Sequence, residues 1–195
     1  MKEIVLASSN EGKIKEFGEI LKEFKILSLK DIGFTDEIEE NGKTFEENAL
    51  IKAREVSKFL KENNLSYPVI ADDSGLCVPE LNGEPGIYSA RYSGVHGNSS
   101  LNRRLLMEKI KDKEKSAYFT CFIVWYNSDD DYKVFHGETY GQIVLEEKGN
   151  NGFGYDCIFL SDDLGKTFGE ATDEEKNKVS HRYRAIKELQ KEIKY

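Results

Sequence analysis

The sequence predicts an α/β fold with a mixed β-sheet, and two observations support this prediction. In the first half of the chain, short apolar runs alternate with longer segments whose apolar residues recur at helical spacing. In the second half, two long segments of alternating apolar and polar residues follow one another, as the strands of a hairpin do. Strands that alternate with helices favour a parallel sheet, and a hairpin adds antiparallel strands, so the sheet should be mixed.

The first elements should be a strand, a helix and a second strand. The apolar run over residues 2–7 predicts a buried strand, and residues 8–12 form the turn that follows it. A helix is expected over residues 12–24, because its apolar residues fall on one face. Residues 25–29 then predict a short strand. The residues of that helix face are Ile14, Phe17, Leu21 and Phe24.

An acidic, irregular stretch over residues 31–43 leads into the second helix. Thr44 and Glu47 have the spacing of a capping box, so the helix should begin there and continue to about residue 63. Residues 68–71 form another apolar strand, which is expected to end where two aspartates follow it.

The second half of the chain should complete the sheet and close with a helix. A loop rich in glycine and proline comes first, and a glycine-rich turn separates the hairpin from the last strand. The expected segments, in chain order, are a loop over 82–97, a helix over 101–110, paired strands over 117–126 and 133–145, a turn over 149–156, a strand over 157–160 and a helix over 180–193.

The size and composition of the chain are typical of a globular protein. Its 195 residues suit one domain, or at most two, and we expect a single domain over 1–195. Apolar residues make up 38% and charged residues 33%, and no apolar run approaches the length of a membrane span, so no membrane partner is expected. The first residues become polar too soon for a secretory signal.

The cysteines and histidines indicate the compartment and exclude one kind of metal site. Cys77, Cys121 and Cys157 are odd in number and far apart, which fits a reducing cytoplasm better than a disulfide framework. We therefore expect a cytoplasmic protein whose cysteines are packing residues. With no CxxC pair and three histidines, a zinc site is not expected.

The formal net charge of −8 argues against a nucleic-acid partner, because such proteins normally carry a basic face. It also limits how the chain could bind an anionic small molecule. Lysines and arginines would have to converge locally, or a divalent metal would have to neutralise the carboxylates.

The turn after the first strand could hold phosphate groups. Backbone N–H groups at a helix start attract anions, and Lys13 lies close enough along the chain to reach them. The spacing is not that of the Walker loop, since Ile14 stands where that motif needs Ser or Thr. Taken alone, the segment favours the simpler interpretation, in which Ser or Asn only caps a helix. The segment consists of Ser8, Ser9, Asn10, Glu11, Gly12 and Lys13.

Two adjacent carboxylates, Asp72 and Asp73, followed by Ser74, could carry the chemistry. Neighbouring side chains on an extended backbone point to opposite sides, so one carboxylate could bind Mg²⁺ while the other takes a proton from water. The alternative is a solvated turn. Function is favoured because Leu76 resumes an apolar run almost at once, which places the pair between buried segments.

The acidic stretch from Asp36 to Glu40 could supply another oxygen ligand. Mg²⁺ takes one or two carboxylates together with the phosphates of a substrate. Most of these acidic residues should simply be solvated. Lys52 lies one helical turn beyond Asn48, so the two side chains could face the same site.

Two later segments could bind a planar ligand. Glycines on either side of Phe153 allow a tight turn that brings an aromatic ring against a base, although the ring could equally pack at a strand start. Lys176, His181 and Arg182 lie near the start of the last helix, where they could donate to an anion or to a base edge. Ser180 is also a plausible helix cap.

Taken in order, these segments resemble the inosine triphosphate pyrophosphatase family, the RdgB-like enzymes that act on non-standard purine nucleotides. The resemblance extends over nearly the whole chain, and six matching pieces in the same order do not arise by chance. The pieces are residues 8–13, 44–49, 71–76, 85–92 and 152–156, and Glu175-Lys176 with Ser180-His181-Arg182.

The resemblance implies a long mixed sheet flanked by helices, two lobes around a nucleotide-binding cleft, and a homodimer. It implies hydrolysis of ITP, dITP and XTP to the monophosphate and pyrophosphate, with Mg²⁺ as the cofactor. Residues 8–13 and Lys52 would hold the phosphates, Glu39, Asp72 and Asp73 the metal, and Asp72 or Asp73 would be the base. The other residues it implies for substrate binding are Ser74, Arg91, Phe153, Gly154, Tyr155, Asp156, Lys176, His181 and Arg182.

Three other functions remain open at this point. A Maf-like pyrophosphatase would act on pyrimidine or modified nucleotides instead. A catalytically silent nucleotide-binding regulator would bind ITP without releasing pyrophosphate, and the intact aspartate pair counts against it. A nucleic-acid-binding module is opposed by the acidic balance of the chain.

Overall fold

The computed structural model describes residues 2–193, and the chain forms two compact units. The first unit contains the chain up to Asp73, then Cys121–His136, then the chain from Ala185 onward. The second unit contains Ser74–Thr120 and Gly137–Arg184. The backbone therefore passes between the units four times.

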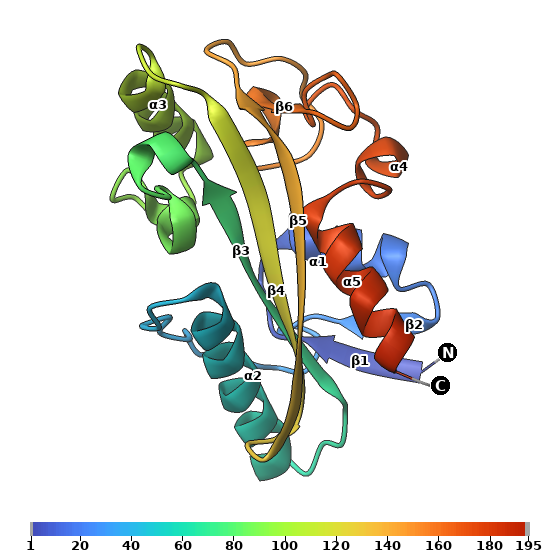
Figure 1. Cartoon of the computed structure of the whole chain (residues 1–195). Helices are drawn as coiled ribbons and strands as arrows, with labels where there is room; N and C mark the ends of the chain where they lie inside the picture. Colours follow the sequence, from blue (N-terminus) through green and yellow to red (C-terminus); the bar gives the residue numbers. More distant parts are fainter. Residues whose placement is uncertain (1, 194–195) are drawn as a thin grey trace. The chain divides into compact units, whose positions relative to one another are not determined.

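The strands form one six-stranded sheet in the order β2-β1-β3-β4-β5-β6 (Figure 1). β1 pairs in parallel with β2 and with β3, whereas β5 pairs antiparallel with β6. The predicted α/β fold with a mixed sheet is thereby confirmed. The strands are β1 Lys2–Leu6, β2 Phe24–Leu27, β3 Val69–Cys77, β4 Ser116–Ser128, β5 Asp131–Ile143 and β6 Phe159–Ser161.

The longer helices begin close to where the sequence predicts them. Side-chain caps explain several of these starts: Asn10 caps α1, Thr44 caps α2 and Asn98 caps α3, each accepting a backbone N–H three residues ahead. The helices are α1 Glu11–Ile20, α2 Phe45–Glu62, α3 Ser99–Ile110, α4 Asp173–Lys176 and α5 His181–Glu192, with 3-10 turns at η1 Pro79–Leu81, η2 Gly86–Arg91 and η3 Asp156–Ile158.

Three boundaries differ from the prediction. The first helix ends at Ile20 and not at Phe24, because Phe24 begins β2 and pairs with Lys2. The last strand starts at Phe159, since the 3-10 turn η3 takes up the residues before it. The strand expected to end before Asp72 continues to Cys77, so the two aspartates lie within β3 and not at its end. The buried run from Leu76 to Val78 keeps this segment extended.

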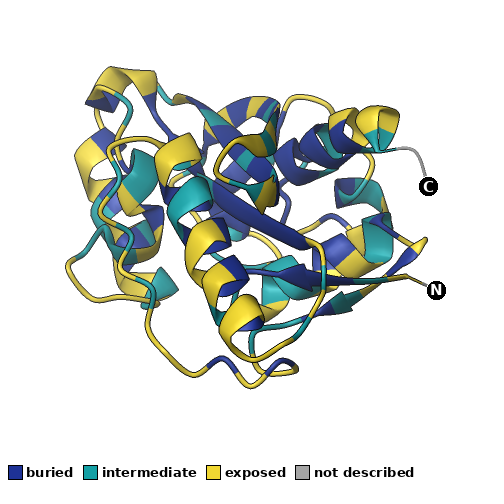
Figure 2. Cartoon of the chain, turned by 90° about the horizontal axis from the view of Figure 1, so that it is seen from below, coloured by how far each residue is buried: buried dark blue, intermediate teal, exposed yellow. Residues whose placement is uncertain are grey.

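In the first unit, helices cover both faces of the sheet. On β1, Ile4 and Leu6 pack with α1 and α5, whereas Val5, together with Ala7 just after the strand, packs with α2. This alternation follows from the two-residue repeat of a strand. Figure 2 shows the buried and exposed faces of these helices in different colours.

The second unit has its own core, in which α3 packs on the ends of β3 and β4. Phe119 on β4 lies 4.7 Å from the ring of Phe159, and Leu76 and Leu106 belong to the same apolar cluster. Within residues 2–193, no helix is long and apolar enough to cross a membrane.

Candidate active site

The two adjacent aspartates of β3 have different partners, as expected for successive residues of a strand. Asp72 is fully buried, and its Oδ1 lies 3.1 Å from Nζ of Lys13 on α1. Asp73 is 7% exposed, and its Oδ1 lies 3.6 Å from Nζ of Lys52 on α2. Each carboxylate is thus matched with one lysine within the first unit.

Asn48 is a third partner of this carboxylate pair, on the same helix face as Lys52, as their spacing in the sequence predicted. Its Nδ2 donates to Oδ2 of Asp73 over 3.2 Å, while its Oδ1 accepts the N–H of Gly42 over 2.9 Å. Asn48 lies one helical turn before Lys52, so both reach Asp73 from the same face of α2. A side chain at Gly42 would approach Asn48 Oδ1 to 2.6 Å, which explains a glycine there.

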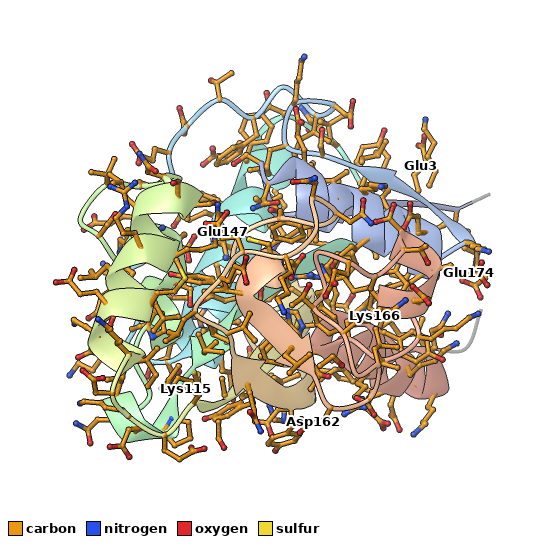
Figure 3. All side chains as sticks on the ribbon, turned by 90° about the horizontal axis from the view of Figure 1, so that it is seen from above. Glu3, Lys115, Glu147, Asp162, Lys166 and Glu174 are labelled. Atoms are coloured by element: carbon orange, nitrogen blue, oxygen red, sulfur yellow. The ribbon has the colours of Figure 1, made fainter. Side chains whose placement is uncertain are left out.

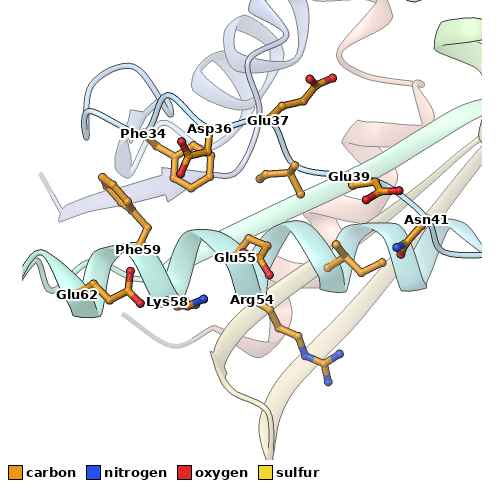
Figure 4. A pocket seen from close by; sticks show the side chains of 12 residues that line it. Phe34, Asp36, Glu37, Glu39, Asn41, Arg54, Glu55, Lys58, Phe59 and Glu62 are labelled. Atoms are coloured by element: carbon orange, nitrogen blue, oxygen red, sulfur yellow. The ribbon is translucent and has the colours of Figure 1, made fainter.

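The acidic loop before α2 contributes Glu40 to this group. Oε2 of Glu40 lies 3.3 Å from Nζ of Lys52, so the ammonium group bridges Glu40 and Asp73. The family resemblance implies a metal ligand at Glu39, the neighbouring residue. Glu39 is exposed and lines a groove of about 590 Å³ between the loop and the outer face of α2 (Figure 4). The path of this irregular loop brings Glu40, and not the exposed Glu39, to Lys52.

Burial controls the protonation of this cluster. Burial raises the pKa of Asp73, and the positive charges of Lys52 and Lys13 oppose that rise only in part. Burial by itself lowers the pKa of Lys52, but the charges of Asp73, Glu40 and Asp72 raise it by more, so the net direction is upward. The lysine therefore stays charged beside a carboxylate that is easier to protonate than usual.

The predicted phosphate segment forms the start of α1 in the same unit. Asn10 Oδ1 accepts the N–H of Lys13 over 3.0 Å, and Ser8 Oγ accepts the N–H of Asn10 over 3.2 Å. The side chains are thus used as caps, in agreement with one of the two interpretations of the sequence. Lys13 also binds Asp72, so the helix start and the carboxylate pair are neighbours. Exposed residues at this start are Ser9, Asn10 and Glu11, with Gly12 partly buried.

Residues of the second unit surround the ring of Phe153. Nζ of Lys176 lies 4.7 Å from the ring centroid, and the guanidinium carbon of Arg182 lies 5.9 Å from it. Lys176 also forms a buried ion pair with Asp156, whose Oδ2 is 2.6 Å from its Nζ. The same oxygen accepts the N–H of Phe153 over 2.8 Å, and this bond closes the turn.

Four other predicted substrate residues have defined places in the second unit. Arg182 is 1% exposed, and its Nη2 donates to Oγ of Ser74 over 2.9 Å. His181 is buried and stacks on the ring of Phe119 at 4.8 Å. The guanidinium of Arg91 lies 5.2 Å from the ring of Tyr88, which is 54% exposed.

The structure gives Tyr155 an inward position. Its hydroxyl donates to the backbone carbonyl of Ser89 over 2.7 Å, and burial raises its pKa. The aromatic turn therefore has one ring, Phe153, beside the cations and one ring, Tyr155, in the core. Two glycines fit this turn for different reasons. Gly152 has φ +70°, and a Cβ there would lie 2.0 Å from Oδ2 of Asp156, whereas Gly154 has φ +62° and open space.

A comparison with known protein families places the chain. The sequence model of the Ham1 family matches residues 4–192. The chain belongs to the Ham1 family. This agrees with the resemblance found in the sequence.

Relatives of this Ham1 family member align over its full length. It is 48% identical to a dITP/XTP pyrophosphatase of Clostridium perfringens, covering 100% of this chain and 98% of that protein. It is 45% identical to a dITP/XTP pyrophosphatase of Bacillus subtilis, covering 98% of this chain and 96% of that protein.

Solved structures of the family have the same fold. The Ham1 protein of Staphylococcus aureus is 42% identical with a TM-score of 0.83, covering 97% of both chains. A HAM1 protein from Coxiella burnetii is 38% identical with a TM-score of 0.84, covering 98% of both chains.

Proposed function

We propose that this chain hydrolyses non-standard purine nucleoside triphosphates, ITP, dITP and XTP, to the monophosphate and pyrophosphate. The observation that carries the proposal is the cluster around Asp73, where a buried carboxylate is held by Asn48 and Lys52 beside the Asp72–Lys13 pair. The full-length relatives named dITP/XTP pyrophosphatase support this choice of substrate.

The first unit supplies the groups that would bind the phosphate chain. The start of α1 offers backbone N–H groups and the positive end of the helix dipole, which favour an anion. Lys13 and Lys52 add two positive charges within reach of the carboxylate pair. These local charges answer the objection that a chain of net charge −8 should repel a triphosphate.

The carboxylates suit Mg²⁺, which prefers oxygen ligands and usually keeps bonds to substrate phosphates. Among residues 2–193, no group of three His, Cys, Asp or Glu side chains is arranged to hold a metal ion. Phosphate oxygens of the substrate would therefore have to complete the ligand set. Asp73 and Glu40 both contact the same ammonium group, so their oxygens already converge on a positive charge. We assign them as ligands, with Asp72 beside them, and favour Glu40 over Glu39. When bound, the ion would neutralise charge on the phosphate oxygens.

Asp73 is the better candidate for the general base. Its raised pKa brings the carboxylate closer to the proton affinity that base catalysis needs, whereas Asp72 is fully buried against Lys13. Water would form the new bond to the α-phosphorus, and its proton would pass to Asp73. The bond between that phosphorus and the bridging oxygen would break, and pyrophosphate would leave.

The second unit supplies the groups proposed to recognise the base. Lys176 and Arg182 are donors beside Phe153, whose ring offers a stacking surface. Hypoxanthine and xanthine carry a carbonyl at position 6, which a donor can satisfy. Adenine carries an amino group there, so two donors would face each other and ATP would be disfavoured.

A substrate panel tests the proposal. Pyrophosphate release would be measured with ITP, dITP, XTP, ATP, GTP, dTTP and UTP, with Mg²⁺ and after chelation. We expect pyrophosphate release from ITP, dITP and XTP, and we expect it to stop when Mg²⁺ is chelated. Preference for dTTP or UTP would indicate a Maf-like enzyme, and ITP binding without release would indicate a regulator.

We also propose a homodimer in the cytoplasm. Within residues 2–193, Cys77, Cys121 and Cys157 form no disulfide, which is compatible with a reducing compartment. Sedimentation at several protein concentrations would show whether the chain dimerises. No nucleic-acid partner is proposed, because the acidic balance opposes one.

A further inference from the structure

Arg103 on α3 forms a hydrogen bond to the turn that carries Phe153. Nη1 of Arg103 donates to the carbonyl oxygen of Gly154 over 2.8 Å. Its Nε and Nη2 donate to the two carboxylate oxygens of Glu147, over 2.8 and 3.2 Å. Figure 3 shows Glu147 beside this helix. One guanidinium group thus joins α3, Glu147 and the turn.

Gly154 is less closely enclosed than the other glycines of this turn. A Cβ at Gly149 or Gly152 would lie 2.0 Å from a neighbouring atom, so those two glycines are tightly enclosed. A Cβ at Gly154 would meet nothing within 4 Å. Glycine is also the residue with the greatest backbone freedom. The Arg103 hydrogen bond therefore restrains the glycine that has open space at its Cβ position.

The guanidinium group of Arg103 is held firmly by its carboxylate partner. The side chain of Arg103 is 16% exposed, and its partner Glu147 holds the guanidinium in a bidentate pair. The hydrogen bonds raise the pKa of Arg103 and lower the pKa of Glu147, so both remain charged. A lysine could not replace it, because a single ammonium group lacks the planar fork that serves a carboxylate and a carbonyl at once.

We propose that Arg103 is a positioning residue for base recognition. By fixing the Gly154 peptide it holds the ring of Phe153 beside Lys176 and Arg182. This inference rests on the proposed function and adds a residue that does not touch the substrate. Arg103→Ala should therefore weaken the interaction with the base and leave the phosphate and carboxylate groups of the first unit unchanged.

Arg103→Ala would be compared with Arg184→Ala, a matched arginine variant of the same unit. Arg184 also donates to one backbone carbonyl and one carboxylate, but not to the turn. Its Nη1 donates to the carbonyl of Glu138 over 2.8 Å, and its Nη2 donates to Asp163 over 2.9 Å. Both variants would be assayed for KM and kcat with ITP, and for inhibition by tripolyphosphate, which has no base. Hydrogen exchange of residues 152–155 would be measured without ligand.

We expect Arg103→Ala to raise KM for ITP about tenfold, the size of one lost charge-assisted hydrogen bond. Its kcat should change less than about twofold, and tripolyphosphate inhibition should not change. Exchange in the turn should accelerate in Arg103→Ala and not in Arg184→Ala, and Arg103→Lys should restore only part of the affinity.

Two results would overturn the inference. Equal exchange in the turn of wild type and Arg103→Ala would show that the arginine does not hold it. Equal changes in the two arginine variants would show a general loss of stability. Failure of the wild type to cleave ITP would instead overturn the proposed function, and the exchange measurement would still decide whether Arg103 restrains the turn.

Discussion

Asn48 and Asp73 are joined by a buried hydrogen bond of 3.2 Å, from the side-chain amide of α2 to the carboxylate of β3. Because Asn48 also accepts the N–H of Gly42, one amide fixes the acidic loop, the helix and the strand together. The bond uses Oδ2 of Asp73, while Oδ1 faces Lys52. The carboxylate thus has a fixed orientation before any substrate binds, which is what a pre-organised base requires.

Asp73→Asn should abolish turnover and leave nucleotide binding intact. The amide has the shape of the carboxylate but cannot accept the proton, so kcat should fall about 100- to 10,000-fold. Steady-state pyrophosphate release and titration with ITP after chelation check the two parts. Asp72→Asn should keep measurable turnover and raise the Mg²⁺ concentration needed for half-maximal rate. Near-normal kcat in both variants would refute the assignment of this pair.

The acid limb of kcat/KM should lie above the ordinary pKa of an aspartate, about 3.9, because burial raises the pKa of Asp73. Lys52→Ala should move that limb to still higher pH, since the lysine charge opposes the rise. A pH–rate profile measures both positions, with Lys58→Ala, an exposed lysine of the same helix, as the control. An unchanged limb in Lys52→Ala would show that Asp73 does not govern it.

The raised pKa of Asp73 also has a consequence for stability. The folded chain favours the neutral carboxyl, so this stabilising contribution is complete below the unfolded pKa. It is lost as the pH rises through the folded value. The Asp73→Asn variant has no carboxyl to titrate at this position. The Tm of the variant minus the Tm of the wild type should therefore increase between about pH 4 and about pH 7, where the wild type loses this contribution. Thermal unfolding of both proteins at several pH values measures this difference. A difference in Tm that stays constant with pH would contradict the prediction.

Lys13→Ala should weaken binding of ITP more than binding of IMP. The lysine is assigned to the phosphate chain, and the monophosphate has fewer phosphate charges to lose. Removing Lys13 also leaves Asp72 buried without that ion pair, which should cost about 1–3 kcal/mol of folding free energy. Calorimetric titration with chelated nucleotides and denaturant unfolding measure both effects. Lys15→Ala, exposed on the same helix, is the control. Equal losses for ITP and IMP would move Lys13 away from the phosphates.

Arg182→Ala should reduce kcat/KM for ITP far more than for ATP. The donor satisfies the 6-carbonyl of hypoxanthine but opposes the amino group of adenine, and an unsatisfied buried group costs about 1–3 kcal/mol. The ITP:ATP ratio should therefore narrow about tenfold. Arg184→Ala, two residues along α5, serves as the control. If both substrates lose activity in equal proportion, Arg182 serves structure or phosphate binding and not selectivity.

The sequence by itself determined the order and kind of the main elements. Apolar spacing placed α1 after β1 and α2 before β3, because each pattern depends only on a repeat along the chain. The aspartate pair stood out because it lies between apolar segments, and Lys13 because it follows the turn at a helix start. Lys52 stood out by its spacing from Asn48, and its phosphate role came from the family resemblance.

Only the tertiary structure decided which of these residues meet. Glu40 and not Glu39 reaches Lys52, because the path of the irregular loop sets the direction of each side chain. β3 continues through Asp73 to Cys77, so its two aspartates point to opposite sides of the strand. The grip of Arg103 on Gly154 joins residues 51 positions apart. Such pairs depend on how separate elements pack, and a local repeat along the chain carries no information about that.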